Sequence, residues 1–295
     1  MDAVKCEAFL SAVDCGSFTA AAEVLGYTQS GITRMINSLE IEVGFSLFVR
    51  SKKGVVLTEN GKAMVPVFRD ILHAHKNAEQ LGADIRGVVR GSLSVGSYFS
   101  VSAIWMPEIL KRFTGQYPGI KVNLQEGGNR EMARWLGEKS VDCCFCAEPP
   151  DGTGCDWLPL FKDELVVWLP KEHPKAASER FCLSELADEP FIITSPNQDT
   201  DQDRLLTKFN LNPDIRFSTK DGYSTYNMVA AGLGVSFNQR LISSKWKGPV
   251  VELPFEPPQY VSLGIAVPSF RETSPATKKF IACAKSFIAS LDIGA

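Results

Sequence analysis

The sequence lacks the apolar runs and the leader pattern that would direct a chain to a membrane. No run in its 295 residues approaches the roughly 20 apolar residues that cross a bilayer. The first residues, MDAVKCEAF, carry acids where a signal peptide has a basic segment followed by an apolar one. These two absences predict a cytoplasmic protein with no membrane partner.

A strong excess of charge of one sign is also absent. The net charge is −3, and 44% of the residues are hydrophobic, which is the usual mixture of a soluble globular protein. This composition excludes a disordered chain. It gives no overall signal of nucleic-acid binding, so any contact with DNA has to come from a local patch of the surface.

Patterns that would indicate catalysis or metal binding are missing as well. The sequence has three scattered histidines and contains no G-x-S-x-G, no H-E-x-x-H and no glycine-rich phosphate loop. We therefore expect no enzymatic activity, no cofactor and no metal site.

Eight cysteines stand in a chain without an export signal, so we expect free thiols. The segment DCCFC contains a C-x-x-C between Cys143 and Cys146 but resembles a short buried strand. Buried apolar packing is the preferred interpretation. A thiol-based switch that uses Cys143, Cys144, Cys146 and Cys155 remains an alternative.

Two helices are predicted between Ser17 and Gly44. Ser17 and Thr28 are suitable N-caps, and Gly26 and Gly44 are suitable C-terminal stops. The second helix, residues 29–43, places apolar side chains at steps of four, three and four, which predicts one buried stripe. That stripe consists of Ile32, Ile36, Leu39 and Val43.

Another face of the second helix carries amides, hydroxyls and a guanidinium. Such groups near a helix N-terminus suit base edges and phosphates in a major groove, and by themselves they suit an ordinary polar surface equally well. The next segment, LFVRSKKGVVLT, favours DNA, because it predicts a cationic hairpin where a winged helix-turn-helix has its wing. The candidate DNA-binding residues are Thr28, Gln29, Ser30, Thr33, Arg34 and Asn37 on the helix, and Arg50, Lys52 and Lys53 on the hairpin.

A long helix is predicted from Glu59, with Thr58 as its cap. Apolar residues recur every seven positions in two registers, which is typical of a helix that pairs with a second helix. The first register is Met64, Ile71, Ala78 and Ile85, and the second is Val67, Ala74, Leu81 and Val88.

From residue 93 onward short β-like runs alternate with helical stretches, which predicts a mainly parallel α/β sheet in two lobes. Polar residues gather where strands are expected to end and helices to begin, and ligands of such folds bind there. These junctions give candidate effector contacts, although each junction alone is an ordinary turn. The candidates are Tyr98, Ser100, Ser102, Asn129, Thr194, Ser195 and Tyr223.

Residues 9–61 resemble the LysR-type transcriptional regulators. The motifs GSFTAAAE, TQSGIT and LTENG stand in that family's order without a gap. The resemblance implies that residues 29–43 form the recognition helix, with Gln29, Ser30, Thr33 and Arg34 at its DNA-contacting positions. It also implies a homodimer through the long helix, a homotetramer, and an effector cleft like that of a periplasmic binding protein.

The fold class we expect is therefore a multidomain α+β chain. A winged helix-turn-helix domain spans 1–58, a linker and dimerisation helix 59–89, and a two-lobed α/β effector domain 90–295. Lobe I is expected at 90–162 and 266–295, and lobe II at 163–265. Double-stranded DNA, a second copy of the chain and a small-molecule effector are the expected partners, and RNA polymerase is a further candidate. A solute-binding α/β protein without DNA function is the other alternative.

Overall fold

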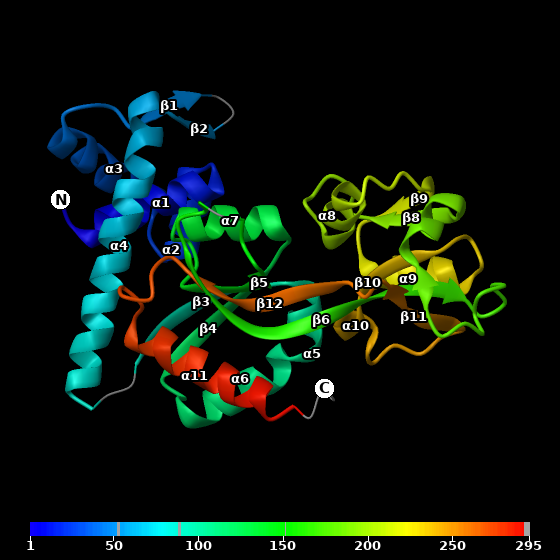
Figure 1. Ribbon diagram of the computed structural model, residues 1–295. Helices are drawn as coiled ribbons and strands as arrows, with labels where there is room; N and C mark the ends of the chain where they lie inside the picture. Colours follow the sequence, from blue (N-terminus) through cyan, green and yellow to red (C-terminus); the bar gives the residue numbers. More distant parts are fainter. Residues whose placement is uncertain (52–53, 88–89, 151, 292–295) are drawn as a thin grey trace. The chain divides into compact units, whose positions relative to one another are not determined.

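The computed structural model describes residues 1–51, 54–87, 90–150 and 152–291. The chain divides into two compact units, one of residues 1–91 with 138–140, and one of residues 92–137 with 141–295 (Figure 1). No helix in the described ranges is both long and apolar enough to cross a membrane.

The first unit is a helical domain with a small hairpin. Its elements are α1 (Ala3–Cys15), α2 (Phe18–Leu25), α3 (Gln29–Val43), β1 (Phe48–Ser51), β2 (Gly54–Leu57) and α4 (Glu59–Ile85). The predicted caps are confirmed. The Ser17 hydroxyl accepts from the backbone N–H of Thr19, and Gly26 and Gly44 adopt the left-handed conformation that ends α2 and α3.

Aromatic rings form the centre of this unit. The Phe9 ring packs 5.1 Å from Phe48 and 5.0 Å from Phe68, measured between ring centroids. Phe68 lies in α4 and is fully buried. The first half of the long helix therefore belongs to the core of the helical domain, and the remainder extends beyond that core (Figure 1).

The second unit is built on an eight-stranded sheet in the order β4-β3-β5-β12-β6-β11-β7, with β10 also pairing with β6. A smaller sheet pairs β8 with β9. The strands are β3 (Gly91–Ser97), β4 (Ile120–Glu126), β5 (Cys143–Ala147), β6 (Asp156–Pro170), β7 (Phe181–Cys182), β8 (Pro190–Thr194), β9 (Asp214–Thr219), β10 (Ser236–Gln239), β11 (Val250–Glu256) and β12 (Tyr260–Val267). The helices are α5 (Phe99–Ile104), α6 (Met106–Gln116), α7 (Asn129–Gly137), η1 (Leu183–Asp188), α8 (Asp201–Lys208), α9 (Gly222–Ala230), α10 (Arg240–Ser243) and α11 (Pro275–Ala289).

The expectation of a mainly parallel sheet is wrong, because the sheet is mixed. Strands β3 and β5 pair in parallel, whereas β12 is antiparallel to both β5 and β6, and β10 and β11 are antiparallel to β6. The chain leaves the first lobe along β6 and returns along β12, so the two strands shared by the lobes run in opposite directions (Figure 1). The alternation of strands and helices along the sequence does not reveal this return, and so it could not predict the antiparallel pairing.

Candidate functional site

The polar face of α3 is organised by its own N-terminal residues. The Thr28 hydroxyl accepts from the Gly31 N–H at 3.1 Å and lies 3.1 Å from the Ser30 hydroxyl. The Gln29 side-chain amide donates to the Thr33 hydroxyl at 3.2 Å. Arg34 is exposed. These contacts keep short donors and acceptors at the surface of the first two turns.

The buried face of α3 matches the predicted stripe. Ile32, Ile36 and Leu39 are almost completely buried, and Val43 packs against the same core. The hydrophobic stripe therefore fixes which side of α3 faces outward, and the polar residues lie on that side. Asn37 is exposed there as well.

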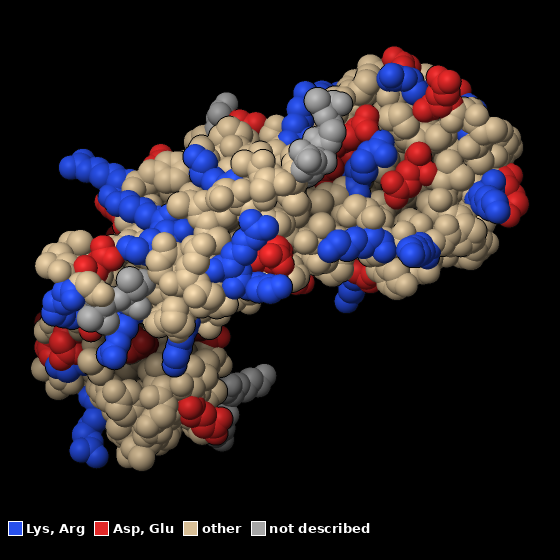
Figure 2. Space-filling model, turned by 90° about the horizontal axis from the view of Figure 1, so that it is seen from below, with Lys and Arg blue, Asp and Glu red and all other residues tan. Residues whose placement is uncertain are grey.

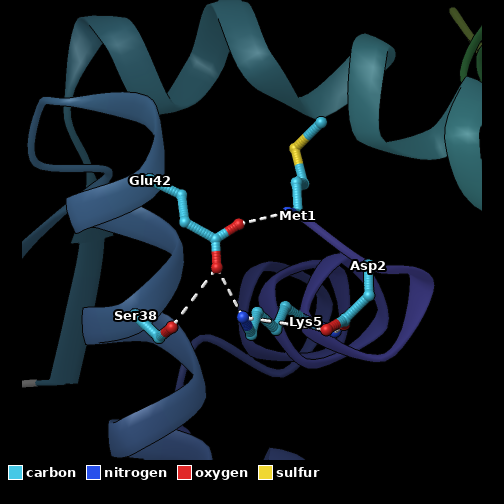
Figure 3. A network of polar contacts seen from close by, with 5 residues as sticks. All are labelled: Met1, Asp2, Lys5, Ser38 and Glu42. Carbon is cyan, nitrogen blue, oxygen red and sulfur yellow. Dashed lines mark hydrogen bonds and ion pairs between the residues drawn. The ribbon is translucent and has the colours of Figure 1, made fainter.

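Two acids at the C-terminal end of α3 fasten the helix to its neighbours. Glu40 accepts from the backbone N–H groups of Leu47, at 2.6 Å, and Phe48, at 3.1 Å, and so joins α3 to the hairpin. Glu42 pairs with Lys5 on α1 and with the amino group of Met1, which precedes that helix, as Figure 3 shows. The hydrogen bond from Lys5 and the amino group lower the pKa of Glu42 to about 2.

The predicted wing is present as the hairpin of β1 and β2, with Phe48 opposite Leu57 and Ser51 opposite Gly54. Arg50 lies in β1, opposite Val55. The expected contacts Lys52 and Lys53 lie outside the described residues. On the face of the protein drawn in Figure 2, basic and acidic side chains are interspersed and neither sign covers the surface.

The heptad residues of α4 divide into two groups. Met64 and Ile71 pack against the core of the helical domain, so they serve their own unit. Val67, Leu81 and Ile85 are 45%, 52% and 78% exposed, an apolar stripe that the described residues do not cover. Val88, the last member of the register that contains Val67 and Leu81, lies outside the described residues.

The second unit contains a cavity of about 510 Å³. Its walls come from the junctions after β3, β4, β8 and β9, and from the end of β10. Five of the seven candidate effector residues line it, and these are Tyr98, Ser100, Asn129, Thr194 and Ser195.

Two hydrogen bonds join opposite walls of this cavity. The Ser100 hydroxyl, on α5, donates to the Gln239 side-chain carbonyl, at the end of β10, over 2.9 Å. The Asn129 amide, on α7, donates to the backbone carbonyl of Asp199. Each bond joins a residue of the first lobe to a residue of the second. The two bonds therefore hold the lobes against each other.

The remaining two candidates, Ser102 and Tyr223, lie outside the cavity lining. Ser102 lies in the buried part of α5, and its hydroxyl has no partner among the described residues. The Tyr223 ring packs against Trp246, with ring centroids 5.2 Å apart. Aromatic packing at the end of the second lobe thus takes this side chain away from the cavity.

Sequence reasoning missed several polar residues of the lining, above all Asp201, Gln202 and Gln239. Gln239 donates from its amide nitrogen to Asp201 at 2.6 Å, and Gln202 accepts from the Thr194 N–H at 2.7 Å. Burial raises the pKa of Asp201. Asp201 and Gln202 open α8, a position at which polar residues usually indicate only a helix start.

The cysteines of β5 are buried, as predicted. Burial raises the pKa of Cys146 to about 12 and raises that of Cys143 and Cys144 as well. A buried protonated thiol is a poor nucleophile, so these positions do not favour a thiol switch. Within the described ranges, no group of His, Cys, Asp and Glu side chains could hold a metal ion.

A helix-turn-helix unit with a wing, followed by a two-lobed α/β unit around a small-molecule cavity, defines a class of transcriptional regulators. Comparison with known families agrees with this architecture. Residues 5–62 match the model described as "Bacterial regulatory helix-turn-helix protein, lysR family", and residues 86–289 match that described as "LysR substrate binding domain".

Individual relatives cover nearly the whole chain. An uncharacterised HTH-type transcriptional regulator of Bacillus subtilis, YvbU, is 27% identical over 97% of this chain and 98% of its own. Full-length OxyR from Pseudomonas aeruginosa superposes with a TM-score of 0.77 at 21% identity, covering 98% of this chain and 97% of that one. Full-length CbnR in complex with its target DNA superposes with a TM-score of 0.64 at 19% identity, covering 97% and 100%.

This chain belongs to the LysR family of transcriptional regulators. It combines a helix-turn-helix DNA-binding domain with an effector-binding domain.

Proposed function

We propose that α3 lies in the major groove of DNA and reads base edges with its exposed polar face. The observation that carries this proposal is the orientation of α3, whose buried stripe turns Gln29, Thr33 and Arg34 to the surface. Amides, hydroxyls and a guanidinium are the groups that hydrogen-bond to base edges. The fold shared with CbnR, which was solved with its target DNA, supports DNA binding by this chain.

Arg34 provides the test. Fragments that the protein prefers are first selected from genomic DNA, and the affinity for a selected fragment is then compared with the affinity for random duplex. Arg34→Ala should weaken binding to the preferred fragment by about 1–3 kcal/mol if the guanidinium pairs with a base. Arg34→Lys keeps the charge and removes the two-pronged geometry, so it should lose most of the same preference.

The control is Arg271→Ala, which removes an exposed arginine from the effector unit. It should leave the preference unchanged. Equal losses on preferred and random duplex in Arg34→Ala would reassign Arg34 to a phosphate contact, and no loss on either would remove α3 from the interface.

We also propose that the wing contacts the DNA backbone through Lys52 and Lys53. Each phosphate contact releases counterions, so replacing both lysines with alanine should flatten the dependence of the logarithm of affinity on the logarithm of salt concentration. An unchanged slope would remove the wing from the interface.

The exposed apolar stripe of α4 supports a homodimer through this helix. Dimerisation would present two copies of α3 to the DNA at about 34 Å, one helical turn, or a multiple of it. We place the dimerising segment at residues 59–89. Two such dimers would then assemble into a tetramer.

The cavity of the second unit is proposed as the effector site. The bond between Ser100 and Gln239 across it gives a ligand a contact through which to act on both lobes. Metabolites that bind the native state raise the melting midpoint of the protein, which identifies the effector. Ser100→Ala should then reduce that shift, whereas Ser102→Ala, in the same helix but outside the cavity, should retain it.

A further inference from the structure

The charges that line the cavity are mostly negative. Four carboxylates, those of Glu126, Glu131, Asp201 and Asp221, belong to the lining, against the single ammonium group of Lys220. Lys220, Glu126 and Asp221 are all exposed, so solvent screens these charges alike, and the carboxylates of Glu131 and Asp201 are the less exposed ones. An anionic ligand entering this cavity would meet net repulsion.

Three donors of the lining are already used by the protein. The Gly128 N–H donates to the Glu131 carboxylate at 3.1 Å, and the Thr194 N–H donates to Gln202 at 2.7 Å. The Ser100 hydroxyl donates to Gln239. An anion would have to displace these acceptors before it gained any hydrogen bond of its own.

The Asp201 carboxylate has more hydrogen-bond acceptor capacity than the described side chains use. Its carboxylate accepts from the Gln239 amide through one oxygen. The nearby guanidinium of Arg204 is held instead by both carboxylate oxygens of Asp199, at 2.8 and 2.7 Å. In the described part of the chain, no cationic side chain forms a hydrogen bond or an ion pair with Asp201.

Tyr98 provides a second, independent observation. It lines the cavity and is only 8% exposed. Its hydroxyl forms no hydrogen bond of standard geometry with a described residue, although the backbone N–H of Ala147 is near enough to act on its pKa. Burial and the charge of Asp201 raise the pKa of Tyr98, which places the phenol and the carboxylate in one electrostatic environment. A buried hydroxyl without a partner is rare in a native fold and indicates a contact that this state lacks.

We propose that the effector of this protein carries a cationic nitrogen, such as a primary ammonium group, that donates to the Asp201 carboxylate and to the Tyr98 hydroxyl oxygen. This inference rests on the proposed function of the cavity. The ammonium group would donate directly to Asp201, which Arg204 influences only from a distance, and would also donate to the Tyr98 hydroxyl. It leaves the bonds of Gly128 and Thr194 intact.

The test uses amines and carboxylates of matched shape on the full chain. The pairs are butylamine with butyrate, putrescine with succinate, and benzylamine with benzoate, each at millimolar concentration and equal ionic strength. The five tryptophans all lie between residues 105 and 246, so the fluorescence melting midpoint reports on the effector unit alone. A ligand of the native state raises this midpoint in a saturable way.

We expect at least one amine to raise the midpoint and its carboxylate partner to leave it unchanged. Asp201→Asn should weaken the amine's apparent affinity on the order of tenfold or more, because a charge-assisted hydrogen bond is lost. Tyr98→Phe, which removes one oxygen, should weaken it less. The matched control is Asp188→Asn, an exposed acid outside the cavity, which should bind the amine as the parent protein does.

A carboxylate that raises the midpoint while no amine does would overturn the cationic assignment, and a loss of its effect in Ser100→Ala would keep the cavity as the effector site. An amine effect that persists in Asp201→Asn would overturn the assignment too. If no compound of either charge shifts the midpoint, the cationic assignment falls together with the proposed effector site. The fragment-binding assay, run on the same samples, shows separately whether DNA binding stands.

Discussion

The hydrogen bonds of Glu40 should be worth more to the DNA-binding unit than those of any exposed acid. Glu40 is half-buried and accepts from the backbone N–H groups of Leu47 and Phe48, whose side chains are buried. A hydrogen bond to a charged group contributes about 1.5–3 kcal/mol. Taking the lower end for each bond, because Glu40 is partly solvated, Glu40→Ala should destabilise the unit by about 3 kcal/mol.

Glu40→Gln separates charge from geometry. The amide oxygen can still accept, so the loss should be about half as large. The control is Glu23→Ala, an exposed acid on α2, which should stay within about 0.5 kcal/mol of the parent protein.

The assay is urea denaturation followed by two signals. Circular dichroism follows the helical first unit as well as the second, whereas tryptophan fluorescence follows the second unit only, since all five tryptophans lie there. Glu40→Ala should therefore shift the dichroism transition and leave the fluorescence transition in place. Hydrogen exchange at the amides of Leu47 and Phe48 should accelerate. A variant that matches Glu23→Ala in both measurements would refute the reasoning.

Three further perturbations test other parts of the structure. Tyr98→Phe should raise the stability of the ligand-free effector unit by about 1 kcal/mol, because it removes a buried hydroxyl without a partner; a lower melting midpoint would contradict this. Burial raises the pKa of Asp163 to about 7 from 3.8. The folded state thus binds the extra proton, and this group's contribution to stability falls as pH rises through that interval; Asp163→Asn should flatten the decline seen by fluorescence. Replacing Leu81 and Ile85 together with aspartate should convert the proposed dimer to monomer in sedimentation velocity, with the fluorescence melting midpoint unchanged.

The helical half could be predicted closely because its signals are local. A cap hydroxyl, a left-handed glycine and an apolar stripe act over three or four residues, so Ser17, Thr28 and Gly44 are recognisable without knowledge of the rest of the chain. Even in this half, tertiary packing determines which surface the apolar residues of α4 contact, and local periodicity does not. The heptad pattern assigned Met64 and Ile71 to a partner helix, and the core of their own domain uses them instead.

The cavity could be predicted only in part, because its walls depend on contacts between distant segments. Polar residues after β3, β4 and β8 are visible as strand-to-helix junctions, and five of the seven candidates line the cavity. Gln239 gives no such signal. It is the last residue of a short buried strand and becomes important only because β10 pairs with β6 and brings it opposite Ser100. Tyr223 shows the converse, since packing on Trp246 outweighs its position at a junction.

Gln239 connects the chemistry of the cavity with the arrangement of the lobes. Its carbonyl accepts from Ser100, on one wall, while its amide nitrogen donates to Asp201, on the other side of the cavity. A cation bound at Asp201 competes with that amide for the carboxylate, and an amide released from Asp201 no longer has a fixed orientation toward Ser100. A ligand shifts an arrangement only through a difference in affinity for its two states. The Ser100–Gln239–Asp201 series supplies such a difference, because occupancy at Asp201 changes the hydrogen bond that holds the lobes together.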